Sequence, residues 1–182
     1  MDHIDLSVLY DYVFNDDMEV CGQIVRSAGE PHKLVLHKLT RGQIDGTGRA
    51  LCIQDDSKRI FHTHPYNAYA YPSLEDINKV SKRNTIKYSL IVTIWGLWII
   101  EKIADRTINV LNDEVIDHAT NRLGYQTKRF NRSEFQSKSI DYNDIVRYEV
   151  GAYLDTMNRH LAGNIMIYFK SWKHLDKEIY LK

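Results

Sequence analysis

The feature that most constrains the fold of this chain is a short apolar strand that ends in two histidines and is followed by a capped helix. The strand pattern spans residues 58–64 around an Ile-Phe centre, and Pro65 ends it. After a tyrosine-rich spacer, Ser73 begins a helix expected to run to about Lys82. If strand and helix meet, the end of the strand lies beside the first turn of the helix.

Three side chains at this junction are of the types that bind zinc. Residues two apart in a strand point to the same face, so His62 and His64 present their imidazoles together. Asp76 lies in the first turn of the helix, so the three residues offer two nitrogens and one oxygen and leave a fourth position for water. A zinc-bound water titrates near pH 7 and supplies hydroxide. Ser-x-x-Asp alone is typical of a helix N-cap and His-x-His alone of a polar strand face, but their coincidence favours a metal site.

The same residues resemble the signature of a known enzyme family. The segment His62–Pro65, followed by Ser73-x-x-Asp76, is similar to the motif of the JAMM (MPN-plus) zinc metalloproteases, and Glu19–Gly22 resembles the upstream glutamate element of that family. The spacer at residues 65–72 is one residue longer than is usual in the family.

The resemblance implies a role for each of five residues. His62, His64 and Asp76 would bind one Zn²⁺ per chain together with a catalytic water, and Glu19 would be the general acid/base that assists attack by that water. Ser73 would stabilise the oxyanion. The implied fold is α/β, an MPN (JAMM, cytidine-deaminase-like) mixed β-sheet flanked by helices.

The implied activity is hydrolysis of an isopeptide or peptide bond, most plausibly at the C-terminus of ubiquitin or a ubiquitin-like modifier, as in a deubiquitinase. Conjugates of such modifiers would be the substrates. The alternative is a non-catalytic MPN-type scaffold that binds partners. A (β/α)₈ hydrolase barrel needs about 250 residues, and a zinc deaminase needs a Pro-Cys-x-x-Cys motif that this sequence lacks.

The composition limits the remaining possibilities. A length of 182 residues fits a single domain, 1–182, and 24 basic against 24 acidic residues leave no net positive field for nucleic acid. No apolar run is long enough to span a bilayer, and the acidic N-terminus does not resemble a signal peptide. Cys21 and Cys52 have no paired spacing, so we expect buried free thiols, a reducing compartment and a cytoplasmic location.

Periodicity predicts the other elements of an α/β or α+β sandwich. Gly22 should mark a bulge or a close backbone approach. We expect helices at 4–15, 109–123 and 143–161; hairpins formed by 18–25 with 32–40 and by 86–94 with 97–103; closing strands at 165–170 and 178–181; and loops at 41–48 and 125–141.

Overall fold

The structure is a computed structural model. It describes residues 2–44, 46, 50–52, 57–66, 68, 70–104, 142–161, 163–172 and 178–181. The strands are β1 (Asp2–Asp5), β2 (Val20–Ser27), β3 (Glu30–Arg41), β4 (Gln43–Ile44), β5 (Ala50–Leu51), β6 (Arg59–Thr63), β7 (Tyr88–Thr93), β8 (Gly96–Lys102), β9 (Ile165–Ser171) and β10 (Glu178–Leu181). The helices are α1 (Ser7–Asn15), α2 (Leu74–Lys82) and α5 (Tyr142–Leu161).

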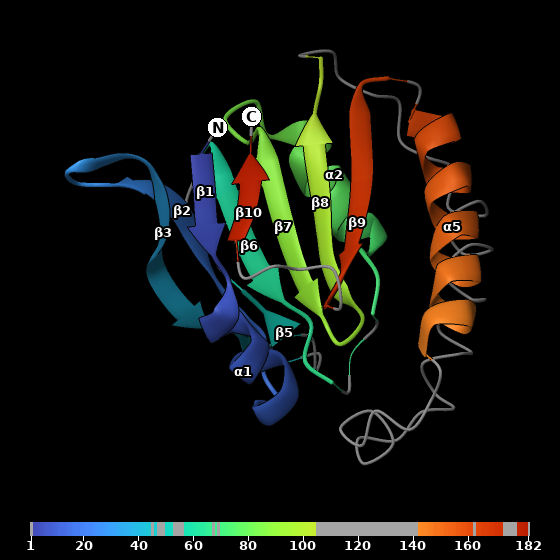
Figure 1. Cartoon of the computed structure of the whole chain (residues 1–182), viewed down its shortest axis with the longest axis horizontal. Coiled ribbons are helices and arrows are strands. Elements are labelled where there is room, and N and C mark those ends of the chain that lie inside the picture. Colours follow the sequence, from blue (N-terminus) through green and yellow to red (C-terminus); the bar gives the residue numbers. More distant parts are fainter. Residues whose placement is uncertain are drawn as a thin grey trace.

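An eight-stranded mixed sheet forms the centre of the molecule, in the order β10-β1-β3-β2-β6-β7-β8-β9. The pairs β1–β3 and β6–β7 are parallel and the other neighbouring pairs are antiparallel. In Figure 1, α2 lies behind the sheet at β7 and β8, and α5 lies beside β9. This confirms the predicted α/β class with a mixed sheet.

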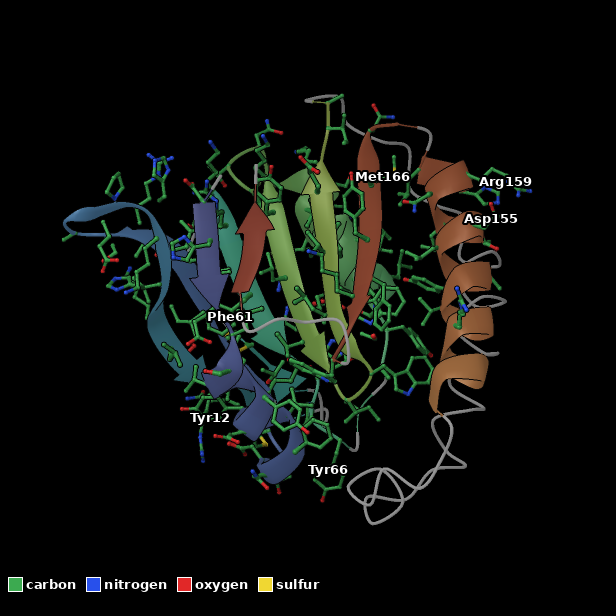
Figure 2. All side chains as sticks on the ribbon, in the orientation of Figure 1. Tyr12, Phe61, Tyr66, Asp155, Arg159 and Met166 are labelled. Carbon is green, nitrogen blue, oxygen red and sulfur yellow. A yellow bond between two sulfur atoms is a disulfide. The ribbon has the colours of Figure 1, made fainter. Side chains whose placement is uncertain are left out.

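Alternation along β6 separates the two faces of the sheet. His62 pairs with Ile91 of β7, which pairs with Trp98 of β8, so these side chains share one face. The Trp98 ring contacts the ring of Tyr153 edge to face at 5.2 Å, so α5 covers this face. On the outer side of α5, Asp155 and Arg159 form an exposed ion pair and point away from the sheet (Figure 2).

The predicted hairpin of β2 and β3 is confirmed, and Gly22 has the predicted effect. The pairing of β2 with β3 shifts register between Cys21 and Gln23. A Cβ at Gly22 would lie 2.6 Å from the carbonyl oxygen of His37 and 2.9 Å from a ring carbon of Phe61. Any side chain there would separate β2 from its neighbours, because such contacts are too short.

The N-terminus differs from the prediction. The helix predicted from residue 4 begins only at Ser7, and the preceding residues form β1 between β3 and β10. Ile4 is fully buried and pairs with Ile179 of β10. Ile4 fitted the helical period, but it belongs to a strand because the strand with which it pairs lies at the other end of the sequence.

The segment 41–48 was predicted to be a plain loop, and this is wrong in part. Its residues Gln43 and Ile44 form β4, which pairs antiparallel with β5 in a separate two-stranded sheet. Two-residue strands are too short to leave a periodic signal in the sequence.

Other predicted elements lie where they were expected. The hairpin of β7 and β8, the helix α2, the helix α5 and the strands β9 and β10 are all present. Among the described side chains of α5, Val150, Tyr153, Met157 and Leu161 are buried in the core. The helix predicted at 109–123 and the loop predicted at 125–141 lie outside the described residues. Within the described part of the chain, none of the helices has the length and apolarity needed to cross a membrane.

Candidate metal centre

Strand β6 brings two imidazoles to one place. His62 lies within the strand, and His64 follows its last residue and donates its backbone N–H to the carbonyl oxygen of Val92 at 2.8 Å. This bond extends the pairing with β7 past the end of β6. Both histidine side chains are therefore held on the face of the sheet that α2 and α5 cover.

The first turn of α2 supplies the carboxylate. Ser73 is the N-cap, its hydroxyl oxygen accepts the backbone N–H of Asp76, and the Asp76 carboxylate accepts the backbone N–H of Ser73. This reciprocal arrangement is a capping box. At the other end of α2, the buried ammonium of Lys102 donates to the carbonyl oxygens of Ser81 and Arg83, each at 3.2 Å. Both ends of the helix that carries Asp76 are thus fixed.

Two core side chains donate hydrogen bonds to the long spacer between His64 and Ser73. The indole N–H of Trp98 donates to the carbonyl oxygen of Ala70 at 2.8 Å, and the hydroxyl of Tyr153 donates to the carbonyl oxygen of Pro72 at 3.0 Å. Burial, and then the charge of Asp76, raise the pKa of Tyr153 well above its usual value, so this hydroxyl keeps its proton. The additional residue is accommodated without separating the helix from the strand.

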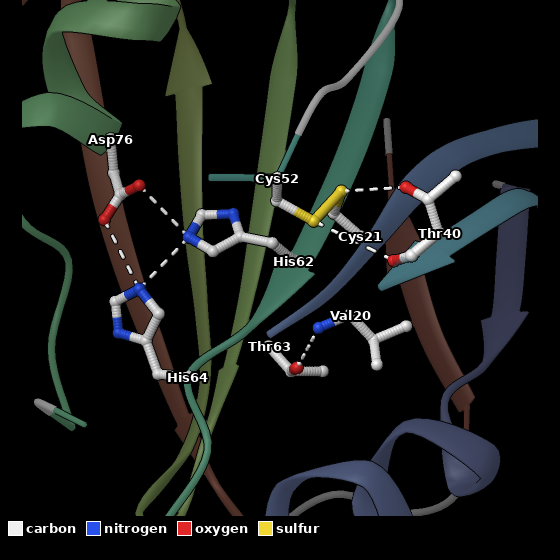
Figure 3. Close-up of a disulfide and its surroundings, with 8 residues drawn as sticks. All are labelled: Val20, Cys21, Thr40, Cys52, His62, Thr63, His64 and Asp76. Atoms are coloured by element: carbon white, nitrogen blue, oxygen red, sulfur yellow. Dashed lines mark hydrogen bonds and ion pairs between the residues drawn. A yellow bond between two sulfur atoms is a disulfide. The ribbon is translucent and has the colours of Figure 1, made fainter. Parts of the chain in front are cut away.

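The three predicted ligands converge. The Nε2 atoms of His62 and His64 lie 3.1 Å apart, and Oδ1 of Asp76 lies 3.0 Å from Nε2 of His62 (Figure 3). Oδ2 of Asp76 lies 3.6 Å from Nε2 of His64. All three side chains are buried, and one ligand atom from each lies within 4.8 Å of the others.

These distances suit a tetrahedral ion. Zinc bonds of 2.0–2.1 Å at tetrahedral angles separate neighbouring ligand atoms by about 3.3 Å. Two neutral imidazole nitrogens and a carboxylate oxygen are also the ligand set of catalytic zinc sites. Of the two oxygens of Asp76, Oδ2 already accepts the N–H and the hydroxyl of Ser73 at 2.7 Å each, so Oδ1 is the oxygen available to an ion.

The negative charge of Asp76 favours the binding of a cation by this cluster. Burial by itself raises the pKa of Asp76, but the charges and hydrogen bonds of His62 and His64 outweigh it and hold this pKa well below its usual value. The carboxylate is therefore ionised at neutral pH.

The second ring nitrogen of His62, Nδ1, is buried and has no hydrogen-bond partner in the part of the chain that the structure describes. Histidines that bind a metal usually donate a hydrogen bond from this second nitrogen.

Glu19 lies directly before β2 and is half-buried. It is outside the three-residue cluster. The antiparallel pairing of β2 with β6 ends at Cys21 and His62, so Glu19 lies two residues beyond the position that pairs with His62. A carboxylate beside the cluster but not within it is what the predicted acid/base role requires.

The hydroxyl of Ser73 is engaged. It donates to Oδ2 of Asp76 at 2.7 Å, so in this structure its proton orients a ligand. The predicted oxyanion role requires that hydroxyl to turn toward a substrate, and it remains a prediction.

The prediction of two free thiols is wrong. Cys21 and Cys52 form a disulfide, and the Cys21 sulfur also lies 3.3 Å from the hydroxyl of Thr40 (Figure 3). Because Cys21 is paired with His62, the disulfide lies beside the cluster of His62, His64 and Asp76. No spacing motif signals a bond between cysteines 31 residues apart. The pairing also removes the support that unpaired cysteines gave to a reducing compartment.

Three further residues support the site, and sequence reasoning missed them. Trp98 and Tyr153 hold the spacer, and the buried hydroxyl of Thr63 accepts the backbone N–H of Val20 at 2.9 Å. For Thr63, the only signal in the sequence was that a polar residue lies inside a strand that is otherwise buried.

Comparisons of the chain with family models, with curated proteins and with solved structures give no match.

Proposed function

We propose that this chain is a zinc-dependent metalloprotease of the JAMM type with an MPN fold. The observation that supports the proposal is the convergence of His62, His64 and Asp76, with Glu19 two residues from the position in β2 that pairs with His62. The motif similarity and the mixed sheet with flanking helices agree with it. The substrate class, an isopeptide or peptide bond at the C-terminus of ubiquitin or a ubiquitin-like modifier, rests on the family resemblance.

Each residue of the site has a separate role in the proposed reaction. His62, His64 and Oδ1 of Asp76 would hold the zinc ion, which supplies Lewis-acid polarisation of the scissile carbonyl and activation of a water. Glu19 accepts the proton of the attacking water and returns it to the leaving amine. Ser73 keeps Asp76 in place through its N–H and hydroxyl. The covering of α2 and α5 limits access of bulk water to the ligands, because all three are buried.

The proposal is tested by metal content together with cleavage of a ubiquitin dimer. The wild-type protein should bind one zinc and cleave the dimer. Glu19→Gln should retain zinc and lose activity by a factor of about 10² to 10⁴, the usual contribution of a general base. His64→Ala should lose both zinc and activity.

Three outcomes would contradict the proposal. A folded wild-type protein that binds no zinc would favour the non-catalytic scaffold. Equal loss of zinc in Glu19→Gln and His64→Ala would make Glu19 a ligand and remove its acid/base role. Cleavage that persists after chelation of the metal would exclude the zinc mechanism.

A further inference from the structure

The peptide unit between Glu19 and Val20 is held from both sides. The carbonyl oxygen of Glu19 accepts the backbone N–H of Gly42, which follows β3, at 2.7 Å. The N–H of Val20 donates to the hydroxyl of Thr63, the last residue of β6, at 2.9 Å. The C=O and N–H of one planar peptide point in opposite directions, so these two bonds fix its orientation.

Thr63 completes the pairing of β2 with β6 through its side chain. The last backbone pair between these strands is Cys21 with His62. At the next position along β2, the partner of the Val20 N–H is the hydroxyl of Thr63 (Figure 3). The hydroxyl therefore holds the chain one residue beyond the ladder, at the point where Glu19 leaves it.

The place of Thr63 in the strand excludes direct contact with a metal or substrate. It lies between the two histidines, so its side chain is on the opposite face of the sheet, and it is fully buried. The described partner of its hydroxyl is the N–H of the peptide unit that joins Glu19 to Val20, so the hydroxyl is connected to the backbone of Glu19.

We propose that Thr63 is a positioning residue that holds Glu19 beside the metal cluster. This inference rests on the proposed function, because it assigns Thr63 to the same reaction. Removal of the hydroxyl leaves the Val20 N–H buried without a partner, and the chain must shift to satisfy it. That shift moves Glu19, whereas the three ligands keep their own anchors in β7 and α2.

The test is a double-mutant cycle between Thr63 and Glu19, read both on zinc affinity and on kcat. The variants are Thr63→Val, Glu19→Gln and the double variant. Thr63→Ser and Thr63→Ala form a second pair that differs by the hydroxyl alone. Thr93→Val is the matched control, because Thr93 is also fully buried and its hydroxyl accepts the N–H of Trp95 at 3.2 Å, in the β7–β8 turn.

We expect Thr63→Val to lower kcat about tenfold or more, with little change in KM, because general-base catalysis depends on the reach of the carboxylate. Thr63→Ser should restore kcat to within about threefold, while Thr63→Ala should behave like Thr63→Val. Glu19→Gln should cost little further activity in the Thr63→Val background. Thr93→Val should leave kcat unchanged.

The zinc measurement does not depend on activity. A carboxylate near a dication strengthens its binding, so Glu19→Gln should weaken zinc binding by about threefold or more in the wild-type background. In the Thr63→Val background the same change should have less than half that effect. If the protein cleaves no ubiquitin dimer but shows this coupling, the isopeptidase proposal is wrong and the positioning role of Thr63 is still supported.

Three results would overturn the positioning role of Thr63. The first is a Glu19→Gln effect on zinc affinity that is the same in both backgrounds, or absent from both. The second is wild-type kcat in Thr63→Val. The third is loss of the folded circular-dichroism spectrum in both Thr63→Val and Thr63→Ala, which would assign the hydroxyl to the stability of the fold.

Discussion

The two ends of strand β6 each carry a buried cluster of titratable groups, and the clusters differ in kind. At the start of the strand, the guanidinium of Arg59 lies 3.0 Å from the carboxylate of Asp2, which Arg26 also approaches at 3.2 Å. At the other end, the imidazoles of His62 and His64 face the carboxylate of Asp76. The first cluster is on the face of Thr63, and the second is on the opposite face.

The difference lies in what each cluster contains. In the Asp2 cluster, cationic donors face an anionic acceptor, so the cluster includes its own counter-charge. In the histidine cluster, two imidazole nitrogens lie about 3 Å apart and one of them lies about 3 Å from a carboxylate oxygen, and neither ring is a permanent cation. Such convergence is unfavourable without a shared proton or a cation. The Asp2 cluster therefore contains both of its opposite charges. The histidine cluster contains no permanent cation, and a bound metal ion would supply one.

The largest expected effect is that zinc stabilises the protein through the histidine cluster alone. At a zinc concentration a thousandfold above Kd, the free energy of unfolding should rise by about 4 kcal/mol, because only the folded chain brings the three ligands together. Thermal unfolding with and without zinc measures this gain. His64→Ala should abolish it, and His32→Ala, a change to an exposed histidine 3.8 Å from Asp2, should not. Equal gains in both variants would remove the distinction between the clusters.

The next effect concerns the disulfide that stands beside His62. Chain entropy of a loop across 31 residues gives about 3.7 kcal/mol of stabilisation, so Cys52→Ser should lower the free energy of unfolding by that amount. Urea titration measures it. Dithiothreitol should destabilise wild type similarly and leave Cys52→Ser unaffected. A wild-type urea midpoint that does not respond to reductant would show that the bond does not contribute.

The smallest effect is the acid response of the Asp2 cluster. Burial raises the pKa of Asp2, but Arg26 and Arg59 outweigh it and lower this pKa below its ordinary value. A carboxyl with a lowered folded-state pKa contributes stability above its unfolded pKa of about 3.9 and loses it as the pH falls through the folded value. Wild type should therefore exceed Asp2→Asn in stability at pH 6, and the difference should shrink below about pH 4. A difference that is constant with pH would show that Asp2 is not held by these cations.

The sequence predicted local features of the fold better than remote pairings. The helix from Leu74 and the hairpin around Gly96 have signals within a few neighbouring residues, namely a capping box and a run of β-branched residues beside a glycine. Strand β1 had no such signal, since it is defined by pairing with β10 at the other end of the sequence. The short pairing of β4 with β5 was missed for a related reason, because two residues carry no period.

The same distinction applies to the site. His62, His64 and Asp76 were predictable because strand alternation and the first helical turn fix their directions. The bond between Cys21 and Cys52 was not predictable, because it depends on how the segment after β3 returns to β2. The sequence also could not show whether the Ser73 hydroxyl donates to Asp76 or to an oxyanion, because both roles use the same side chain.

The helix that carries Asp76 begins in a capping box and ends on the ammonium of Lys102, which has three hydrogen-bond donors and also lies 3.5 Å from the side-chain oxygen of Asn84. A cation at this end also complements the partial negative charge of the helix C-terminus. The helix can therefore neither slide nor turn about its axis without breaking bonds at both ends. The entropy cost of ordering the carboxylate is met during folding, so an ion that bound here would find Asp76 already oriented.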